Sequence, residues 1–86
     1  MIDLQEYRKE IDKINLEIVE LLRKRQDVSR KIGELKRGVG KEVLDGSREQ
    51  VIFDRVMDVA DEKSMDGDYI RDVFKLIIQN SREVQE

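Results

Sequence analysis

The sequence predicts an all-α fold with three helices per chain, one long and two shorter. Proline is absent and only 5 of the 86 residues are glycine, so few positions interrupt a helix. Charged residues make up 43% of the chain, and the apolar residues between them recur at steps of three and four. This spacing places apolar side chains on one face of a helix. A chain of this length forms one domain, which we expect to span residues 1–86.

The first predicted helix spans about residues 4–37. Its apolar positions form a heptad-like seam, which consists of Leu4, Tyr7, Ile11, Ile14, Ile18, Leu21, Val28, Ile32 and Leu35. One seam position, residue 25, is Arg. Gly38 and Gly40 are expected to end this helix, and residues 37–42 to form a flexible loop.

The second predicted helix begins within residues 45–47, where Asp45 and Ser47 are candidate N-caps. Ser47 with Gln50 fits a capping box. One face carries Ile52, Val56, Val59 and Ala60, and the helix is expected to end near residues 63–64. The third helix is expected to begin at residues 66–68 and to run to about Gln85. Its apolar face consists of Ile70, Val73, Phe74, Ile77, Ile78 and Val84.

The long seam predicts a homodimer. A helix over residues 4–37 is about 50 Å long at about 1.5 Å per residue, whereas a compact domain of this size has a radius of gyration of about 12 Å. The two shorter helices cannot cover a seam of that length. We therefore expect two long helices to share their seams, and a plain dimeric coiled coil without chemistry remains an alternative at this point.

The composition excludes several functions. Without Cys or His there is no thiolate nucleophile, no Ser-His-Asp triad and no zinc ribbon. The net charge of −3 argues against nucleic acid as the main partner. No apolar run is long enough to cross a membrane. No secretory signal is visible at the N-terminus, so we expect a cytoplasmic protein.

Polar residues stand where the helical pattern calls for apolar ones. Arg25, Ser29 and Lys36 share one face of the first helix, and Ser81 and Gln85 share one face of the third. A partly buried guanidinium needs an anion, which favours an anion site. The alternatives are a salt bridge from Arg25 to the partner helix, a solvated Lys36, a backbone-bonded Ser81 and a frayed Gln85.

Two further groups extend this pattern. Arg48 and Glu49 follow Asp45 at the start of the second helix, where free N–H groups bind oxygen atoms, although ordinary first-turn capping is the alternative. Arg8 lies about 25 Å from Arg25 along the first helix, so one small ligand cannot touch both in a single chain. In an antiparallel dimer, Arg8 of one chain approaches Arg25 of the other. Together these residues predict a cationic, partly dry pocket.

Several short motifs occur in a fixed order. They are YRKEID at 7–12, LLRKR at 21–25, IGELK at 32–36, DGSRE at 45–49, YI at 69–70 and FKLIIQNS at 74–81, followed by Gln85. In this order and spacing the chain resembles the all-helical class of chorismate mutases, over essentially its whole length. The resemblance implies an intertwined homodimer with two active sites, each built from both chains. It also implies rearrangement of chorismate to prephenate, the branch step toward phenylalanine and tyrosine, with no metal or cofactor. We expect no fused dehydratase, dehydrogenase or regulatory domain.

The resemblance also implies a role for each site residue. Arg8 comes from the partner chain and binds the carboxylate of the enolpyruvyl side chain. Arg25 binds a substrate carboxylate with the help of Ser81, and Arg48 supports the carboxylate cluster.

The remaining implied roles concern the oxygen atoms of the substrate. Lys36 and Gln85 donate to the ether oxygen, where negative charge develops as the C–O bond breaks. Glu49 and the backbone near Asp45 hold the ring hydroxyl. Such a pericyclic reaction needs no nucleophile, which suits a chain without His or Cys.

Two other functions stay open on these residues. An isochorismate–pyruvate lyase has the same fold and a similar cationic pocket, and differs in releasing salicylate and pyruvate. A non-catalytic dimeric helical module predicts that Arg25, Lys36, Ser81 and Gln85 do not converge on a cavity.

Overall fold

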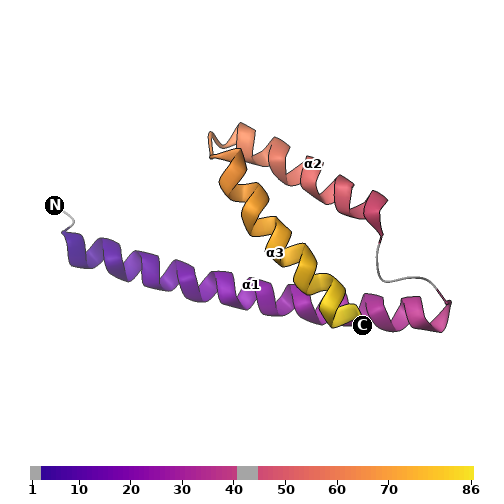
Figure 1. Ribbon diagram of the computed structural model, residues 1–86. Helices are drawn as coiled ribbons and strands as arrows, with labels where there is room; N and C mark the ends of the chain where they lie inside the picture. The colour runs from indigo at the N-terminus through magenta and orange to yellow at the C-terminus, as the bar shows by residue number, and fades with distance from the viewer. Residues whose placement is uncertain (1–2, 41–44) are drawn as a thin grey trace.

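The computed structural model is all-α (Figure 1). The structure describes residues 3–40 and 45–86, and within these ranges it contains helices and turns but no strand. Helix α1 spans Leu4–Gly38, α2 spans Gly46–Glu62 and α3 spans Gly67–Gln85. The prediction of one long and two shorter helices is confirmed, with boundaries within about two residues of those expected.

Each helix begins at an aspartate. The carboxylates of Asp3, Asp45 and Asp66 accept hydrogen bonds from backbone N–H groups of the first turns of α1, α2 and α3 at 3.0, 3.0 and 2.9 Å. The predicted Ser47–Gln50 capping box is wrong. Because Asp45 starts α2 earlier, Ser47 already lies inside the helix, and the Gln50 amide donates to Asp54 at 2.8 Å instead.

The end of α1 differs from the expected loop. Arg37 and Gly38 are still helical, and Val39 is the C-cap, whose N–H donates to carbonyl groups of the last turn. Arg37 also donates from Nη1 to the carbonyl oxygen of Gln85 at 2.6 Å, which ties this last turn to α3. Gly40 then adopts a positive φ of 71°. The rest of the predicted loop, at residues 41 and 42, lies outside the described residues.

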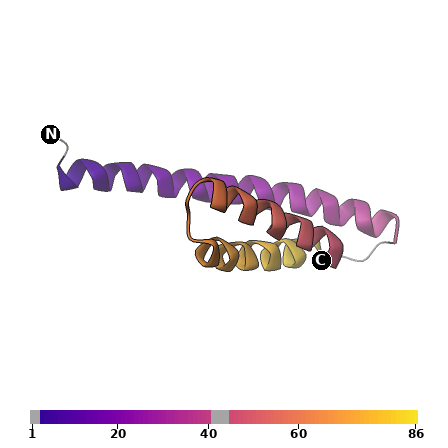
Figure 2. The ribbon, with the colours of Figure 1, turned by 90° about the horizontal axis from the view of Figure 1, so that it is seen from above.

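The three helices are arranged around α3, which crosses the C-terminal half of α1 and packs along α2 (Figure 1). Within the described ranges, no Cα atom of α1 lies within 8 Å of a Cα atom of α2. The N-terminal half of α1 extends beyond both other helices, as the view from above also shows (Figure 2). The molecule is accordingly elongated, at 58 × 24 × 15 Å with a radius of gyration of 16.3 Å.

The chain buries a small core. Ala60 and Ile78 are its buried apolar residues among those described. The seam residues from Leu4 to Leu21 are between 48% and 63% exposed. This agrees with the expectation that one chain cannot cover its own seam. The homodimer itself stays a prediction.

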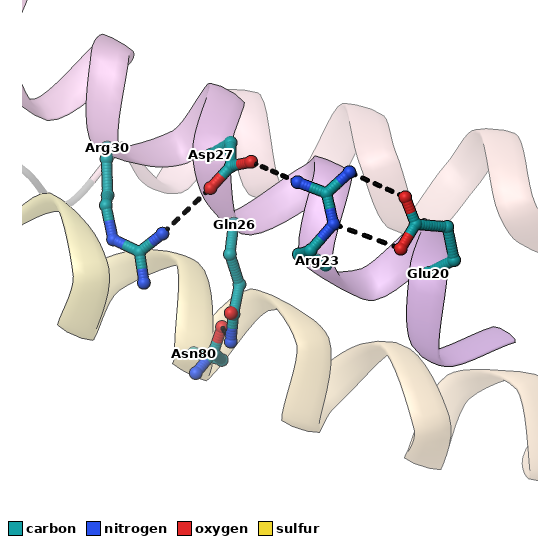
Figure 3. Close-up of polar contacts among 6 residues, drawn as sticks. All are labelled: Glu20, Arg23, Gln26, Asp27, Arg30 and Asn80. Atoms are coloured by element: carbon teal, nitrogen blue, oxygen red, sulfur yellow. Dashed lines mark hydrogen bonds and ion pairs between the residues drawn. The ribbon is translucent and has the colours of Figure 1, made fainter. Parts of the chain in front are cut away.

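The outer face of α1 carries a ladder of ion pairs (Figure 3). Arg23 bonds Glu20 on one side and Asp27 on the other, and Arg30 bonds the same Asp27 at 3.0 Å. These side chains are 44–55% exposed, so each pair contributes little to stability.

Across residues 3–40 and 45–86, none of the helices has the length and apolar character that a membrane span needs. The cytoplasmic location stays a prediction.

Candidate active site

A cavity of about 240 Å³ lies between the three helices. Its lining is Arg25, Val28, Ser29, Ile32, Lys36, Asp45, Arg48, Glu49, Ile52, Ile78, Ser81, Arg82 and Gln85. Seven of the eight residues proposed from the sequence are among them, and Arg8 is not. The structure thus brings together residues that lie up to 60 positions apart in the chain.

Arg25 and Ser81 form one polar group of the cavity, where α1 and α3 cross. The Arg25 guanidinium donates to Ser81 Oγ, which itself donates to the carbonyl oxygen of Ile77 at 3.1 Å. Ser29 Oγ lies 3.5 Å from Ser81 Oγ. Burial, and to a lesser degree the charge of Arg48, lowers the pKa of the Arg25 guanidinium. An arginine keeps its charge even so, which leaves a partly desolvated cation that an anionic ligand can pair.

Lys36 and Gln85 form a second polar group. Lys36 Nζ donates to Gln85 Oε1 at 3.0 Å, which leaves the amide NH₂ of Gln85 as a donor toward a ligand. Gln85 is 8% exposed although it is the last residue of α3, so the alternative of a frayed end is wrong.

Two residues that the sequence reasoning missed hold the backbone of Gln85 against α1. Gly33 is buried under it, and a Cβ atom at Gly33 would lie 2.5 Å from the Gln85 carbonyl oxygen. Arg37 donates to that same oxygen. A glycine inside a helical pattern often marks close approach of another backbone, and this signal could have identified Gly33. Arg37 offers no comparable signal, because it stands next to glycines that predict a loop.

The start of α2 forms the third side of the cavity with Asp45, Arg48 and Glu49. Arg82 of α3 bonds both carboxylate oxygens of Glu49, from Nε to Oε2 at 2.7 Å and from Nη2 to Oε1. The hydrogen bond from Arg82 is the main reason that the pKa of Glu49 lies below its usual value. The same bond raises the pKa of Arg82. The sequence reasoning missed Arg82, although it lies four residues after Ile78 and three before Gln85 and therefore shares their side of α3.

Arg8 lies in the exposed N-terminal half of α1, outside the cavity of its own chain. Its approach to a partner's site stays a prediction.

Among residues 3–40 and 45–86 there is no group of three His, Cys, Asp or Glu residues that could hold a metal ion.

The cavity therefore presents arginine and lysine donors, a neutral amide and hydroxyl, and one carboxylate that arginine keeps ionised. Such a set can bind carboxylates and hydroxyl groups of a small molecule and fix its conformation. The fold and the site together define an all-helical protein with a cationic cavity suited to a small anion.

The comparisons with known proteins identify the family. The family model for chorismate mutase type II matches residues 7–86, and the chain belongs to this family. Membership makes it an isomerase of the chorismate mutase type.

Individual relatives agree with this assignment. The chain is 29% identical over 83 residues to the chorismate mutase of Methanocaldococcus jannaschii, which covers 96% of this chain and 84% of that protein. It is 32% identical over 79 residues to the bifunctional chorismate mutase/prephenate dehydratase of Buchnera aphidicola, of which it spans only 20%. A solved structure of a conserved hypothetical protein from Pyrococcus furiosus matches with a TM-score of 0.78 at 34% identity, covering 96% of this chain and 95% of that one.

Proposed function

We propose that this chain, as a homodimer, rearranges chorismate to prephenate in the biosynthesis of phenylalanine and tyrosine. The observation that carries the proposal is the convergence of Arg25, Lys36, Glu49 and Gln85 on one cavity. The name of the bifunctional relative from Buchnera aphidicola joins a chorismate mutase to a prephenate dehydratase, which fits prephenate as the product.

The reaction is an intramolecular rearrangement. The C–O bond between the ring and the enolpyruvyl group breaks while a C–C bond forms between the enolpyruvyl methylene carbon and the ring, so no atom enters or leaves. The enzyme has to hold a flexible dianion in its compact, reactive conformation. In this proposal Arg25 and Ser81 grip one substrate carboxylate and Arg48 supports the cluster. The partner subunit's Arg8 binds the enolpyruvyl carboxylate.

Rate acceleration comes from donors that act more strongly on the transition state than on the substrate. As the C–O bond breaks, negative charge builds on the ether oxygen, and Lys36 with the amide NH₂ of Gln85 stabilises it there. Their mutual hydrogen bond of 3.0 Å supports this role, because it orients both donors before the substrate arrives. Glu49 and the backbone near Asp45 hold the ring hydroxyl, so Glu49 acts on binding and orientation.

The test is to mix the purified chain with chorismate, follow its ultraviolet absorbance and identify the products by NMR. We expect enzyme-dependent loss of chorismate and the appearance of prephenate. If isochorismate instead yields salicylate and pyruvate while chorismate persists, the fold hosts the lyase reaction. If neither substrate is consumed and a bicyclic transition-state analogue does not raise Tm, the chain is a non-catalytic helical dimer.

A further inference from the structure

Arg82 lines the cavity but has no role in the reaction described above. It follows Ser81 on α3 and reaches across to α2, where its guanidinium meets Glu49 side on, with Nε and Nη2 facing the two carboxylate oxygens. This two-point contact is the geometry in which an arginine orients a carboxylate rather than only neutralising it. Glu49 is the more buried partner, with its side chain 16% exposed against 45% for Arg82.

The pair occupies a particular place in the fold. No Cα atom of α2 comes within 8 Å of one of α1 in the described residues, whereas both helices pack against α3 (Figure 1). Among residues 45–86, the Glu49–Arg82 contact is the one side-chain hydrogen-bonded link between α2 and α3. Besides the packing of α2 on α3, Arg82 is therefore the polar contact that can fix the position of the Glu49 carboxylate relative to the α1 side of the cavity.

The contact leaves Glu49 able to bind a ligand. A carboxylate has about four lone-pair sites, and Arg82 takes one on each oxygen, so each oxygen keeps one for a substrate hydroxyl. The carboxylate must be ionised to accept. The charged groups around it are Arg82 from α3, Lys36 from α1 and Asp45 from its own helix, while Arg25 and Arg48 line the same cavity. Arg82 and Lys36 favour the ionised form, Asp45 opposes it, and the Arg82 hydrogen bond is the largest effect.

From this geometry we propose that Arg82 is a positioning residue, which holds the Glu49 carboxylate ionised and oriented toward the substrate hydroxyl and so aligns the α2 side of the site with the α1 side. This inference rests on the proposed function.

The test is kcat/KM for chorismate against pH in four chains: wild type, Arg82→Ala, Glu49→Gln and the double variant. We expect Arg82→Ala to lower kcat/KM about 10-fold at neutral pH, because the carboxylate loses its fixed orientation. At acid pH kcat/KM should fall as Glu49 is protonated, and this fall is the acid limb of the pH profile. In Arg82→Ala the acid limb should move toward neutral pH, because Glu49 becomes easier to protonate. Protonation of the substrate's own carboxylates is common to all four chains and cancels in the comparison.

The double variant separates positioning from general stability. In the Glu49→Gln background, adding Arg82→Ala should lower kcat/KM by less than about 2-fold, because the carboxylate that Arg82 positions is already absent. Arg82→Lys, which keeps the charge and loses the two-point contact, should fall between wild type and Arg82→Ala. Arg71→Ala is the matched control, because Arg71 lies on the same helix, is 47% exposed and pairs with Asp68 away from the cavity. It should leave both kcat/KM and the acid limb unchanged.

Two results overturn the proposal: an Arg82→Ala chain with wild-type kcat/KM and acid limb, or an equal loss with and without the Glu49 carboxylate. If Arg82→Ala does not fold by circular dichroism, Arg82→Lys decides, and wild-type behaviour of that variant in both rate and acid limb overturns the proposal. Failure of the proposed function looks different, since the wild-type chain itself then consumes no chorismate. In that case Tm against pH for the same four chains tests the Arg82–Glu49 coupling, and additive effects at every pH contradict it.

Discussion

The two halves of α1 carry the same apolar pattern and have opposite surroundings. From residue 25 onward the helix lies against α3 and lines the cavity, with Ser29 and Gly33 buried. Its N-terminal half extends beyond the other two helices, and the seam residues from Leu4 to Leu21 are about half exposed (Figures 1 and 2). An isolated protein rarely exposes such a continuous apolar face, so the N-terminal half is the part of the chain that calls for a second copy.

The polar residues of the two halves of α1 also differ in their surroundings. In the C-terminal half, Arg25 and Lys36 each bond a residue of α3 at the cavity. In the N-terminal half, Arg8 does not line this cavity of its own chain. A dimer that covers the exposed seam also supplies a place for Arg8, so one arrangement accounts for both features.

The largest effect is expected from a charge in the exposed half of the seam. Ile14→Glu buries a carboxylate in the proposed dimer interface, so the dimer should dissociate, as measured by light scattering after size-exclusion chromatography. Chorismate turnover should fall by at least about 100-fold, because each site then loses the partner's Arg8. This is the loss expected when one charge-stabilising donor leaves a site. Leu16→Glu is the matched control, since Leu16 is 72% exposed and lies off the seam. A dimeric, active Ile14→Glu chain would contradict the shared-seam arrangement.

In the C-terminal half, Lys36→Ala should lower kcat about 100- to 1000-fold, as removal of one oxyanion donor does, with a smaller change in KM. The reason is that Lys36 acts on charge that develops only in the transition state. Lys31→Ala on the exposed side of the same helix should leave steady-state kinetics unchanged. Near-wild-type kcat for Lys36→Ala would show that the ether oxygen is stabilised by another group.

Gly33→Ala probes how closely α3 must approach α1. The new Cβ would meet the Gln85 backbone at 2.5 Å, which cannot be relieved by a side-chain movement. We expect a loss of stability of about 1–3 kcal/mol by denaturant unfolding, and a drop in kcat as Gln85 moves away from Lys36. Gly38→Ala has no atom within 4 Å of the new Cβ and should stabilise the helix by about 0.5–1 kcal/mol. Equal stability of the two variants would contradict the close contact between Gly33 and the Gln85 backbone.

The smallest effect is expected from acid. The pKa of Glu49 is lower in the folded chain than its ordinary value, so the stability it contributes is present above that ordinary value and is lost as pH falls through the folded pKa. Glu49→Gln should therefore lower Tm at neutral pH and lose this difference in acid. The contribution to stability is modest, because the partner Arg82 is exposed to solvent. A Tm difference that is the same at neutral and acid pH would contradict a native contact with ionised Glu49.

The helical period alone predicted most of the fold and much of the cavity. Arg25 and Lys36 lie three turns apart on one face of α1, and Ser81 and Gln85 lie one turn apart on α3, so these pairs could be found without a structure. Their roles came from the resemblance to a family, and they stay predictions.

What the sequence could not predict depends on how the helices cross. Arg82 and Arg37 contact residues 33 and 48 positions away, and neither stands in an apolar pattern that would mark it. Asp45 and Ser47 are both candidate caps by residue type, and Ser47 also has the spacing of a capping box, yet Asp45 is the N-cap in the structure. Local propensity offers several caps of similar strength, and only the folded chain selects one.

The most direct test of the shared site mixes two inactive chains. Arg8→Ala and Arg25→Ala should each be nearly inactive as homodimers, because every site in them lacks one arginine. After exchange of subunits, each mixed dimer holds one site with both arginines and one with neither. Half of the dimers are mixed when association is random, so the mixture should regain about a quarter of wild-type chorismate turnover. Turnover no greater than the sum of the two separate variants would contradict a site built from both chains.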